Sequence, residues 1–239
     1  MKKSVFYDNQ KTLKQLEILH EDDSCIVVNK PAGLPTQGGK GVGVSLDSIL
    51  AETCPQRPLL VHRLDRDTSG IVLAAKNKAA AAGFSRLFDS SAGKGVIKRY
   101  HAVCRGIPEK PEGSIKLDLL IRGAEKESIT RYRQLAETEE FSLLELELLT
   151  GRTHQIRRHL FLTGNPVLGD DKYGDFALNR SLRKTMKLKR MLLHASRLII
   201  PQTPGGGSLD ISAPLPAYFR QFMHDAGISF QEIPGASLY

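Results

Sequence analysis

The chain has 239 residues, of which 41% are hydrophobic and 25% are charged, and this composition is typical of a globular protein with a buried core. No stretch approaches the roughly 20 consecutive apolar residues that a membrane span needs, and residues 1–6 lack the apolar core of a signal peptide. The sequence therefore predicts a cytoplasmic protein that does not enter a membrane.

The first half of the chain predicts a series of short elements. Residues 1–15 are polar and are expected to form a flexible N-terminal tail. Two strands at 16–19 and 25–29 are followed by a glycine-rich loop at 33–44. Ser45 then provides an N-cap for a short helix that ends near Glu52.

The remaining elements alternate between strand and helix patterns, with a loop at 61–70 before them. They are a strand at 71–75, a helix at 79–88, a strand at 98–106, alternating strands at 114–149 with a hairpin at 139–140, a helix at 153–162 capped by Thr153, a strand at 191–201 and a helix at 216–225. Many strands with a few helices predict an α+β fold, with a mixed, mainly antiparallel sheet and flanking helices. With neither repeat nor linker, residues 16–239 are expected to form one domain.

Cysteine and histidine spacing gives no sign of a metal site. Cys25, Cys54 and Cys104 are scattered, odd in number and without a C-x-x-C pair, and the seven histidines contain no H-E-x-x-H pair. Neither a disulfide framework nor a metal site is therefore expected.

The net charge of +8 is concentrated in residues 150–200, which contain 11 Lys or Arg and 3 Asp. Such a cluster is typical of a surface that binds a polyanion. A solvated helical face followed by a basic loop would give the same pattern, so charge alone leaves both interpretations open.

The segment H-R-L-D-R-D-T-S-G at 62–70 places Asp65 between two arginines. Neighbouring cations favour the ionised carboxylate, which is then available at neutral pH as a nucleophile or general base. A structural loop held by salt bridges is the alternative. The second carboxylate, Asp67, also allows the two-carboxylate chemistry of a hydrolase.

A second segment, T-G-R-T-H-Q-I-R-R-H at 150–159, begins a predicted helix. His154 and Arg157 are three residues apart and share a face of that helix. A helix N-terminus with nearby arginines can bind phosphate, although an amphipathic surface helix would have the same pattern.

Together, these two segments resemble the RluA family of RNA pseudouridine synthases. The resemblance continues along the chain through L-E-I-L-H-E-D-D at 16–23, V-V-N-K-P-A-G-L at 27–34, K-R-Y-H-A-V at 98–103, G-N-P-V-L-G-D at 164–170 with Tyr173, L-H-A at 193–195 and A-P-L-P at 213–216. It implies the pseudouridine synthase fold and an enzyme that detaches the uracil of a chosen uridine from C1′, turns it and rejoins it through C5, without cofactor or metal.

The resemblance also assigns roles to particular residues. Asp65 matches the catalytic carboxylate, which acts either covalently or by removing a sugar proton. Tyr100 matches the aromatic residue that lies against the base, and Arg157 matches the partner of the catalytic carboxylate. Arg63 matches the residue that enters the base stack when the target uridine is flipped out.

Three further motif residues are expected to contact the substrate: His62, Arg152 and His154. The glycine run at 38–43 lacks the pattern of a P-loop, and Asp67 is expected to be structural or on the surface. The presence of Asp65, Tyr100 and Arg157 favours an enzyme over a non-catalytic RNA-binding or RNA-folding protein on the same fold.

The expected partner is RNA, either tRNA or an rRNA stem-loop, bound by a monomer with no obligate protein partner. Many relatives carry an N-terminal S4-type module; because the first motif begins near residue 16, we expect no such module here, and this expectation favours tRNA or a short stem-loop. Residues 180–190 contain six cations and no acid. They are expected to dock RNA beside the active site, on a helix that Ser181 could cap, and a solvated insertion is the alternative.

Overall fold

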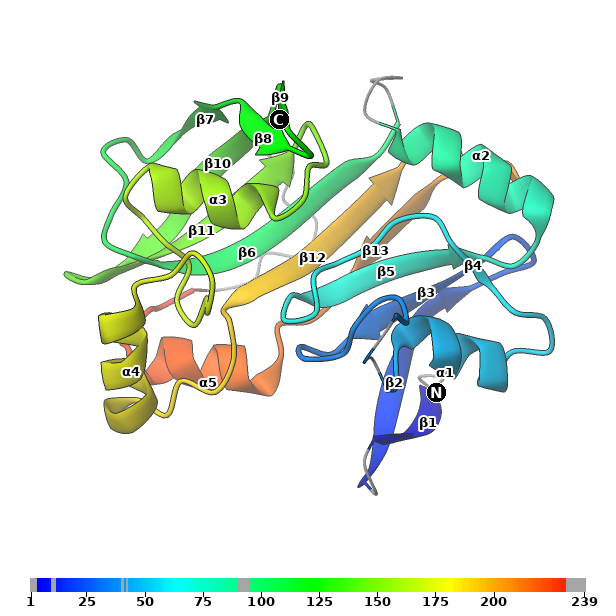
Figure 1. Cartoon of the computed structure of the whole chain (residues 1–239), viewed down its shortest axis with the longest axis horizontal. Helices are drawn as coiled ribbons and strands as arrows, with labels where there is room; N and C mark the ends of the chain where they lie inside the picture. The colour runs from blue at the N-terminus through cyan, green and yellow to red at the C-terminus, as the bar shows by residue number, and fades with distance from the viewer. Residues whose placement is uncertain (1–3, 10–11, 40, 42, 90–94, 231–239) are drawn as a thin grey trace.

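The computed structural model describes residues 4–9, 12–39, 41, 43–89 and 95–230. Over these residues the chain folds around one long, curved sheet with helices against it (Figure 1). In spatial order, its strands are β1 (Ser4–Asn9), β2 (Thr12–Glu21), β3 (Cys25–Lys30), β5 (Ser69–Ala75), β12 (Leu193–Ile200), β6 (Ile97–Arg105), β11 (Phe141–Leu148), β10 (Ile129–Glu137) and β7 (Glu112–Lys116). The strands β4 (Leu59–Leu60) and β13 (Leu209–Ser212) pair at its sides, with β5 and β12 respectively.

A separate two-stranded sheet joins β8 (Leu119–Ile121) to β9 (Ala124–Lys126). The helices are α1 (Leu46–Thr53), α2 (Lys78–Phe88), α3 (Gln155–Leu162), α4 (Phe176–Thr185) and α5 (Ala217–Asp225). In the described residues, every strand pairing is antiparallel except that of β12 with β5. The predicted α+β fold with a mixed, mainly antiparallel sheet is therefore confirmed. Among the same residues, no helix is long and apolar enough to cross a membrane.

The N-terminal segment differs from the flexible tail expected over residues 1–15. There, β1 pairs antiparallel with β2 from Ser4 opposite Glu17 to Asn9 opposite Thr12, and the hairpin forms one edge of the sheet. The strand contains Val5, Phe6 and Tyr7, residue types that favour strands, so the expectation based on the polar residues around them missed it. The domain boundary expected at residue 16 falls inside β2.

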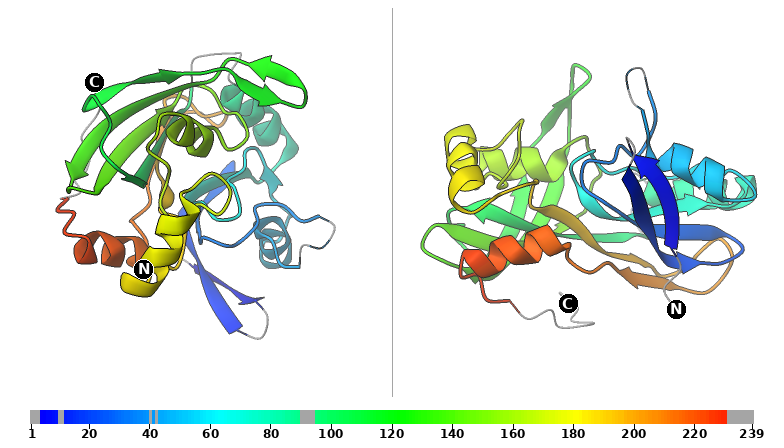
Figure 2. Two further views of the ribbon diagram at one scale, coloured as in Figure 1. Left: turned by 60° about the vertical axis from the view of Figure 1, so that its left-hand side comes forward. Right: turned by 90° about the horizontal axis from the view of Figure 1, so that it is seen from below.

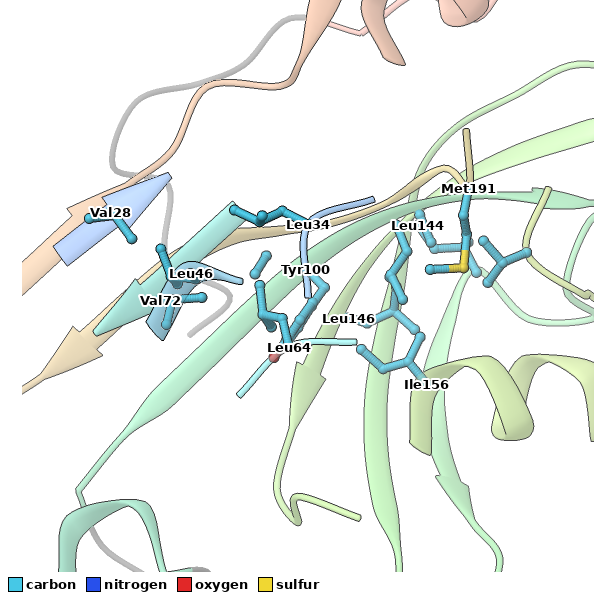
Figure 3. Packing of buried hydrophobic residues seen from close by; sticks show 14 of the residues in the cluster. Val28, Leu34, Leu46, Leu64, Val72, Tyr100, Leu144, Leu146, Ile156 and Met191 are labelled. Atoms are coloured by element: carbon cyan, nitrogen blue, oxygen red, sulfur yellow. The ribbon is translucent and has the colours of Figure 1, made fainter. Parts of the chain in front are cut away.

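Alternation along the strands divides the core between the two faces of the sheet. Tyr100, Ala102 and Cys104 of β6 share one face, as predicted, and belong to a cluster that includes Leu46 of α1 and Ile156 of α3. Figure 3 shows Tyr100 within this cluster. The other face of the same central strands packs on α5 and α4. Its buried side chains include Val103, Leu143, Leu182, Phe219 and Phe222.

The starts of two helices differ from the sequence expectation. Thr153 does not cap α3, whose N-cap is His154, a residue with a φ of 53° and no capping side-chain hydrogen bond. Instead, Gln155 accepts hydrogen bonds from the Arg152 N–H (3.0 Å) and the Thr150 hydroxyl (2.8 Å), which orders the turn that Thr153 was expected to order.

The helix expected in the basic segment also begins elsewhere. Ser181 lies inside α4, and Asp175 is the N-cap, where its carboxylate accepts a hydrogen bond from the Leu178 N–H. The helix ends at Thr185, and Lys187 follows with a φ of 53°. In contrast, the N-cap predicted at Ser45 is confirmed as a reciprocal capping box with Ser48.

Gly70 lies where β5 and β12 pair in parallel, directly after the loop that carries Asp65. Its φ is +111°, and a Cβ added there would lie 2.2 Å from the Ala195 carbonyl oxygen. The close approach of these two strands therefore requires a residue without a side chain at position 70.

We expect Gly70→Ala to destabilise the protein by at least about 1–3 kcal/mol, because it combines backbone strain with a clash against backbone atoms. Urea denaturation measures the effect. Gly43→Ala is a matched control, because no atom lies within 4 Å of a Cβ at that position and its φ lies outside the left-handed region. An unchanged denaturation midpoint for Gly70→Ala would contradict this account.

Candidate active site

All seven residues that the sequence singled out line one cavity of about 240 Å³. They come from three places: the loop between β4 and β5, strand β6, and the turn and first residues of α3. They are His62, Arg63, Asp65, Tyr100, Arg152, His154 and Arg157. Residues separated by up to 95 positions therefore meet in one place, as the motifs predicted.

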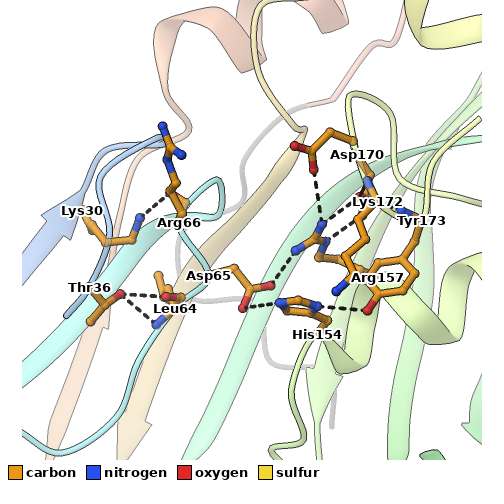
Figure 4. Close-up of polar contacts among 11 residues, drawn as sticks. Lys30, Thr36, Leu64, Asp65, Arg66, His154, Arg157, Asp170, Lys172 and Tyr173 are labelled. Carbon is orange, nitrogen blue, oxygen red and sulfur yellow. Dashed lines mark hydrogen bonds and ion pairs between the residues drawn. The ribbon is translucent and has the colours of Figure 1, made fainter. Parts of the chain in front are cut away.

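The loop that carries Asp65 is held by its backbone on both sides (Figure 4). On one side, the Thr36 hydroxyl donates to the Leu64 carbonyl (2.7 Å) and accepts from the Leu64 N–H (3.2 Å). On the other, the Arg66 carbonyl accepts hydrogen bonds from the Gly33 N–H (2.8 Å) and from Lys30 Nζ (3.0 Å). These contacts fix the backbone on either side of Asp65.

Lys30 has a fully buried side chain, whose ammonium group also donates to the carbonyls of Pro31 and Leu34. Burial lowers the pKa of Lys30 to about 7, although the nearby charges of Asp67 and Asp65 act to raise it. One buried amine thus joins the end of β3 to the loop of the site.

Arg157 connects Asp65 to a second carboxylate, Asp170. Its Nη1 donates to Asp65 Oδ2 at 3.0 Å, while Nε and Nη2 donate to the two oxygens of Asp170 at 2.7 and 2.8 Å. The pair predicted between Arg157 and Asp65 is therefore present, and Arg157 is also held by a bidentate pair that the sequence did not reveal.

Asp170 is suited to this position because its side chain is fully buried and also accepts hydrogen bonds from the Lys172 and Tyr173 N–H groups. Burial acts to raise its pKa, but these hydrogen bonds and Arg157 outweigh burial and lower it. Burial acts to lower the pKa of Arg157, and the two aspartates outweigh that effect and raise it. Both groups are therefore charged at neutral pH.

Tyr100 forms part of the cavity wall and is only 8% exposed. Burial, with a further contribution from the charge of Asp65, raises its pKa above the ordinary value, so the phenol is protonated at neutral pH. Leu64, Leu148, Ile156 and Leu193 line the same cavity. The space beside Asp65 is therefore bounded by apolar side chains that can accept a flat base.

His154 lies on the other side of Asp65, with Nε2 at 3.6 Å from Asp65 Oδ1. Its Nδ1 is 3.1 Å from the Tyr173 hydroxyl, and the Tyr173 ring lies 5.2 Å from the guanidinium of Arg157. Burial lowers the pKa of His154, while Asp65 acts to raise it. His154 and Tyr173 therefore enclose the pair of Asp65 and Arg157.

The other predicted contact residues have different surroundings. His62 accepts a hydrogen bond from the Leu73 N–H (2.9 Å), and its ring stacks on Phe88 at 4.4 Å. Burial, with a contribution from Lys98, lowers the pKa of His62 to about 3, so its ring is neutral. Arg63 is exposed at the opening of the cavity.

Arg152 donates to the Glu127 carbonyl at 3.3 Å. Asp67 is not part of the first cavity and lines a second one, of about 610 Å³, which opens from Asp65 past Arg66 and Lys172. Both carboxylates therefore line the second cavity, but only Asp65 lines the first.

One group elsewhere has the spacing of metal ligands within the described residues: His20, Asp22 and Cys25. Asp22 already accepts hydrogen bonds from the Ser24 and Cys25 N–H groups. Burial raises the pKa of the Cys25 thiol to about 12, which disfavours the thiolate that would bind a metal. This group is explained as the turn between β2 and β3.

The fold is that of the RNA pseudouridylate synthases. The family model of that description matches residues 24–161. A curated relative, ribosomal large subunit pseudouridine synthase C of Rickettsia bellii, is 37% identical over 238 residues, which cover 92% of this chain and 76% of the relative.

Two solved human structures have the same fold. RNA pseudouridylate synthase domain containing 4 aligns with a TM-score of 0.75 and 27% identity, over 89% of this chain and 94% of its own. RNA pseudouridylate synthase domain containing 1 aligns with a TM-score of 0.72 and 29% identity, over 93% and 91%. The chain belongs to the RluA family of RNA pseudouridine synthases and is an enzyme of that class, as the motifs indicated.

We expect Arg157→Ala to cost about 3–5 kcal/mol of stability, because it leaves the buried Asp170 charge without its partner. It should also abolish most pseudouridine formation. Arg157→Lys should restore stability in part but little activity, because an ammonium cannot reach both aspartates with a planar fork. Urea denaturation and tritium release from RNA labelled at uridine C5 measure the two effects, and full activity of Arg157→Ala would overturn the pairing.

Asp170→Asn tests whether the buried carboxylate holds Arg157 in place. We expect a loss of stability of a few kcal/mol, because Arg157 remains buried with one anionic partner fewer. We also expect a fall in kcat that exceeds any change in KM. Asp171→Asn is the matched control, because Asp171 is 71% exposed and lies 3.7 Å from Arg157, so its loss should cost at most about 1 kcal/mol. Equal effects of the two substitutions would contradict the role of Asp170.

Proposed function

We propose that this enzyme converts a specific uridine of large-subunit ribosomal RNA to pseudouridine, with Asp65 as the catalytic carboxylate. The observation that carries the proposal is the position of Asp65, which lies at a cavity walled in part by Tyr100 and leucine side chains and is held by Arg157 at 3.0 Å. The name of the Rickettsia bellii relative supports ribosomal RNA as the substrate in place of the tRNA or short stem-loop that the sequence favoured.

In the proposed mechanism, the target uridine leaves the RNA stack and its base enters the cavity of about 240 Å³. Tyr100 packs against the base, and Arg63, exposed at the opening, occupies the vacated place in the stack. A planar cation there recovers part of the cost of unstacking. His62 and Arg152 border the cavity, where they would contact the RNA around the target.

Asp65 then acts on the nucleoside, either by attack on C1′ or by removal of a proton from the sugar. In both cases the bond from C1′ to N1 breaks, the uracil turns within the cavity, and a bond from C1′ to C5 forms. As that bond forms, C5 displaces Asp65 from C1′ in the first case, and Asp65 returns its proton to the sugar in the second. The C5 proton is then lost to solvent and N1 takes up a proton, so the ring is aromatic again and the product is an isomer of the substrate. Arg157 orients Asp65 throughout, and His154 limits its movement from the other side.

The proposal includes a monomer that needs neither cofactor nor metal and that acts in the cytoplasm. The relatives named for the bacterial large ribosomal subunit support this location. All the proposed catalytic residues come from one chain, which is consistent with a monomer.

Asp65→Asn should lower pseudouridine formation by at least about 100-fold, because the amide keeps the shape of the side chain but is neither a nucleophile nor a base. Asp67→Asn should retain most activity, because Asp67 lies outside the first cavity. Release of tritium from RNA labelled at uridine C5, without strand cleavage, measures the reaction. Equal inactivity of two folded variants would reject a single catalytic carboxylate.

The choice of substrate has its own test. Pseudouridines are mapped in ribosomal and transfer RNA from cells with and without the gene, and from cells that carry only Asp65→Asn. We expect a site in large-subunit ribosomal RNA to disappear in both altered strains. A site lost only from tRNA would overturn the proposed substrate while leaving the enzyme class intact.

A further inference from the structure

Helix α4 and the residues after it form the most concentrated basic segment of the described chain. Residues 176–190 contain six cations, all exposed, and no acid. They are Arg180, Arg183, Lys184, Lys187, Lys189 and Arg190. The nearest preceding acid, Asp175, caps the helix and pairs with Arg105 at 2.9 Å. It is therefore already engaged and does not neutralise these cations.

The exposed face of α4 combines cations with an aromatic ring. Phe176, Arg180 and Arg183 occupy positions i, i+4 and i+7, which lie on one face of a helix. The adjoining side of the helix buries Asn179 and Leu182. Phe176 is 59% exposed, so its ring is accessible from solvent on this face.

This helix is attached to the backbone beside the active site. The Asn179 side chain accepts a hydrogen bond from the Gly169 N–H (2.8 Å) and donates one to the Asp170 carbonyl (2.9 Å). Asp170 in turn holds Arg157, which holds Asp65. The second cavity extends from Asp65 to Lys172, three residues before the N-cap of α4.

We propose that the face of α4 formed by Phe176, Arg180 and Arg183 binds a single-stranded segment of the RNA substrate that flanks the target uridine. Phe176 stacks on an unpaired base, and the two arginines contact phosphates. An aromatic ring among cations, with no acid in the segment, fits a polyanion with flat unpaired bases. An acidic protein segment would match the charge, but it offers no flat bases for the ring to stack on.

The proposal rests on RNA as the substrate and is tested by binding alone. The probe is a fluorescein-labelled oligouridylate, and its Kd is measured by anisotropy between about 50 and 200 mM salt. The proteins carry Asp65→Asn, so that no turnover occurs. The result therefore does not depend on which uridine is modified, and it is separate from the tests of the proposed reaction.

The first comparison removes two charges. Arg180→Ala with Arg183→Ala should flatten the slope of log affinity against log salt by about 1.4–1.8. Lys78→Ala with Arg86→Ala removes two exposed cations from α2, which lies at the other end of the molecule (Figures 1 and 2). This control should leave the slope unchanged. Because alanine has a high helix propensity, all four substitutions should leave the helices intact. Equal slopes for both double variants would overturn the proposal.

The second comparison concerns the aromatic ring. Phe176→Ala should weaken binding about fivefold or more without changing the salt slope, because stacking on a base releases no counterions. Phe176→Tyr should keep nearly the original affinity, because it keeps a ring that can stack. If Phe176→Ala binds as tightly as the parent protein, the stacking part of the proposal is wrong. If the arginine substitutions weaken binding and Phe176→Ala does not, this face binds only the phosphates of the RNA and not its bases.

Discussion

The position of Arg157 between two carboxylates is the constraint on which the rest of the site depends. A buried guanidinium is costly unless anionic partners and hydrogen bonds satisfy its donors. Nε and Nη2 of Arg157 donate to Asp170 as a bidentate pair. This pair fixes the plane of the guanidinium, so that its third nitrogen, Nη1, points at Asp65. Asp170 is itself held by the N–H groups of Lys172 and Tyr173. The direction of the hydrogen bond from Arg157 to Asp65 is thus set by residues 170–173, of which Asp171 and Lys172 line the second cavity but not the first.

The site also depends on the sheet, because the order of its strands brings segments that are distant in the sequence to the same cavity. Strands β5, β12 and β6 are neighbours, so the loop before β5 lies beside the face of β6 that carries Tyr100. Gly70 allows β5 to approach β12 at the end of that loop. Lys30 and Thr36 then fix the backbone around Asp65 from a third direction. The carboxylate is therefore held by groups on several elements, which suits a reaction that depends on geometry within fractions of an ångström.

Much of this could be predicted from the sequence, because the patterns involved are local or belong to family motifs. Alternation predicted the central strands, the helix-start pattern predicted Ser45 as an N-cap, and the two motifs predicted the pair of Asp65 and Arg157. The exceptions have a common physical cause, since each depends on a hydrogen bond between distant or competing groups. Gln155 orders the turn that Thr153 was expected to cap, and backbone pairing with β2 forms β1 in a segment that was expected to be a flexible tail. Asp170 lay within a recognised motif, but only the folded chain shows which arginine it binds.

The attachment of α4 to Asp170 has a consequence for how substrate binding and catalysis are connected. Asn179 is buried and bonds to the backbone of both Gly169 and Asp170, so α4 cannot shift far without disturbing the carboxylate that holds Arg157. An interior this closely packed transmits such a displacement and does not absorb it. An RNA strand bound to the exposed face of α4 would therefore be positioned relative to Asp65 through three hydrogen-bonded links: Asn179 to Asp170, Asp170 to Arg157, and Arg157 to Asp65. Because the same domain would then position both the strand and the carboxylate, recognition outside the cavity can contribute to the precision of the reaction within it.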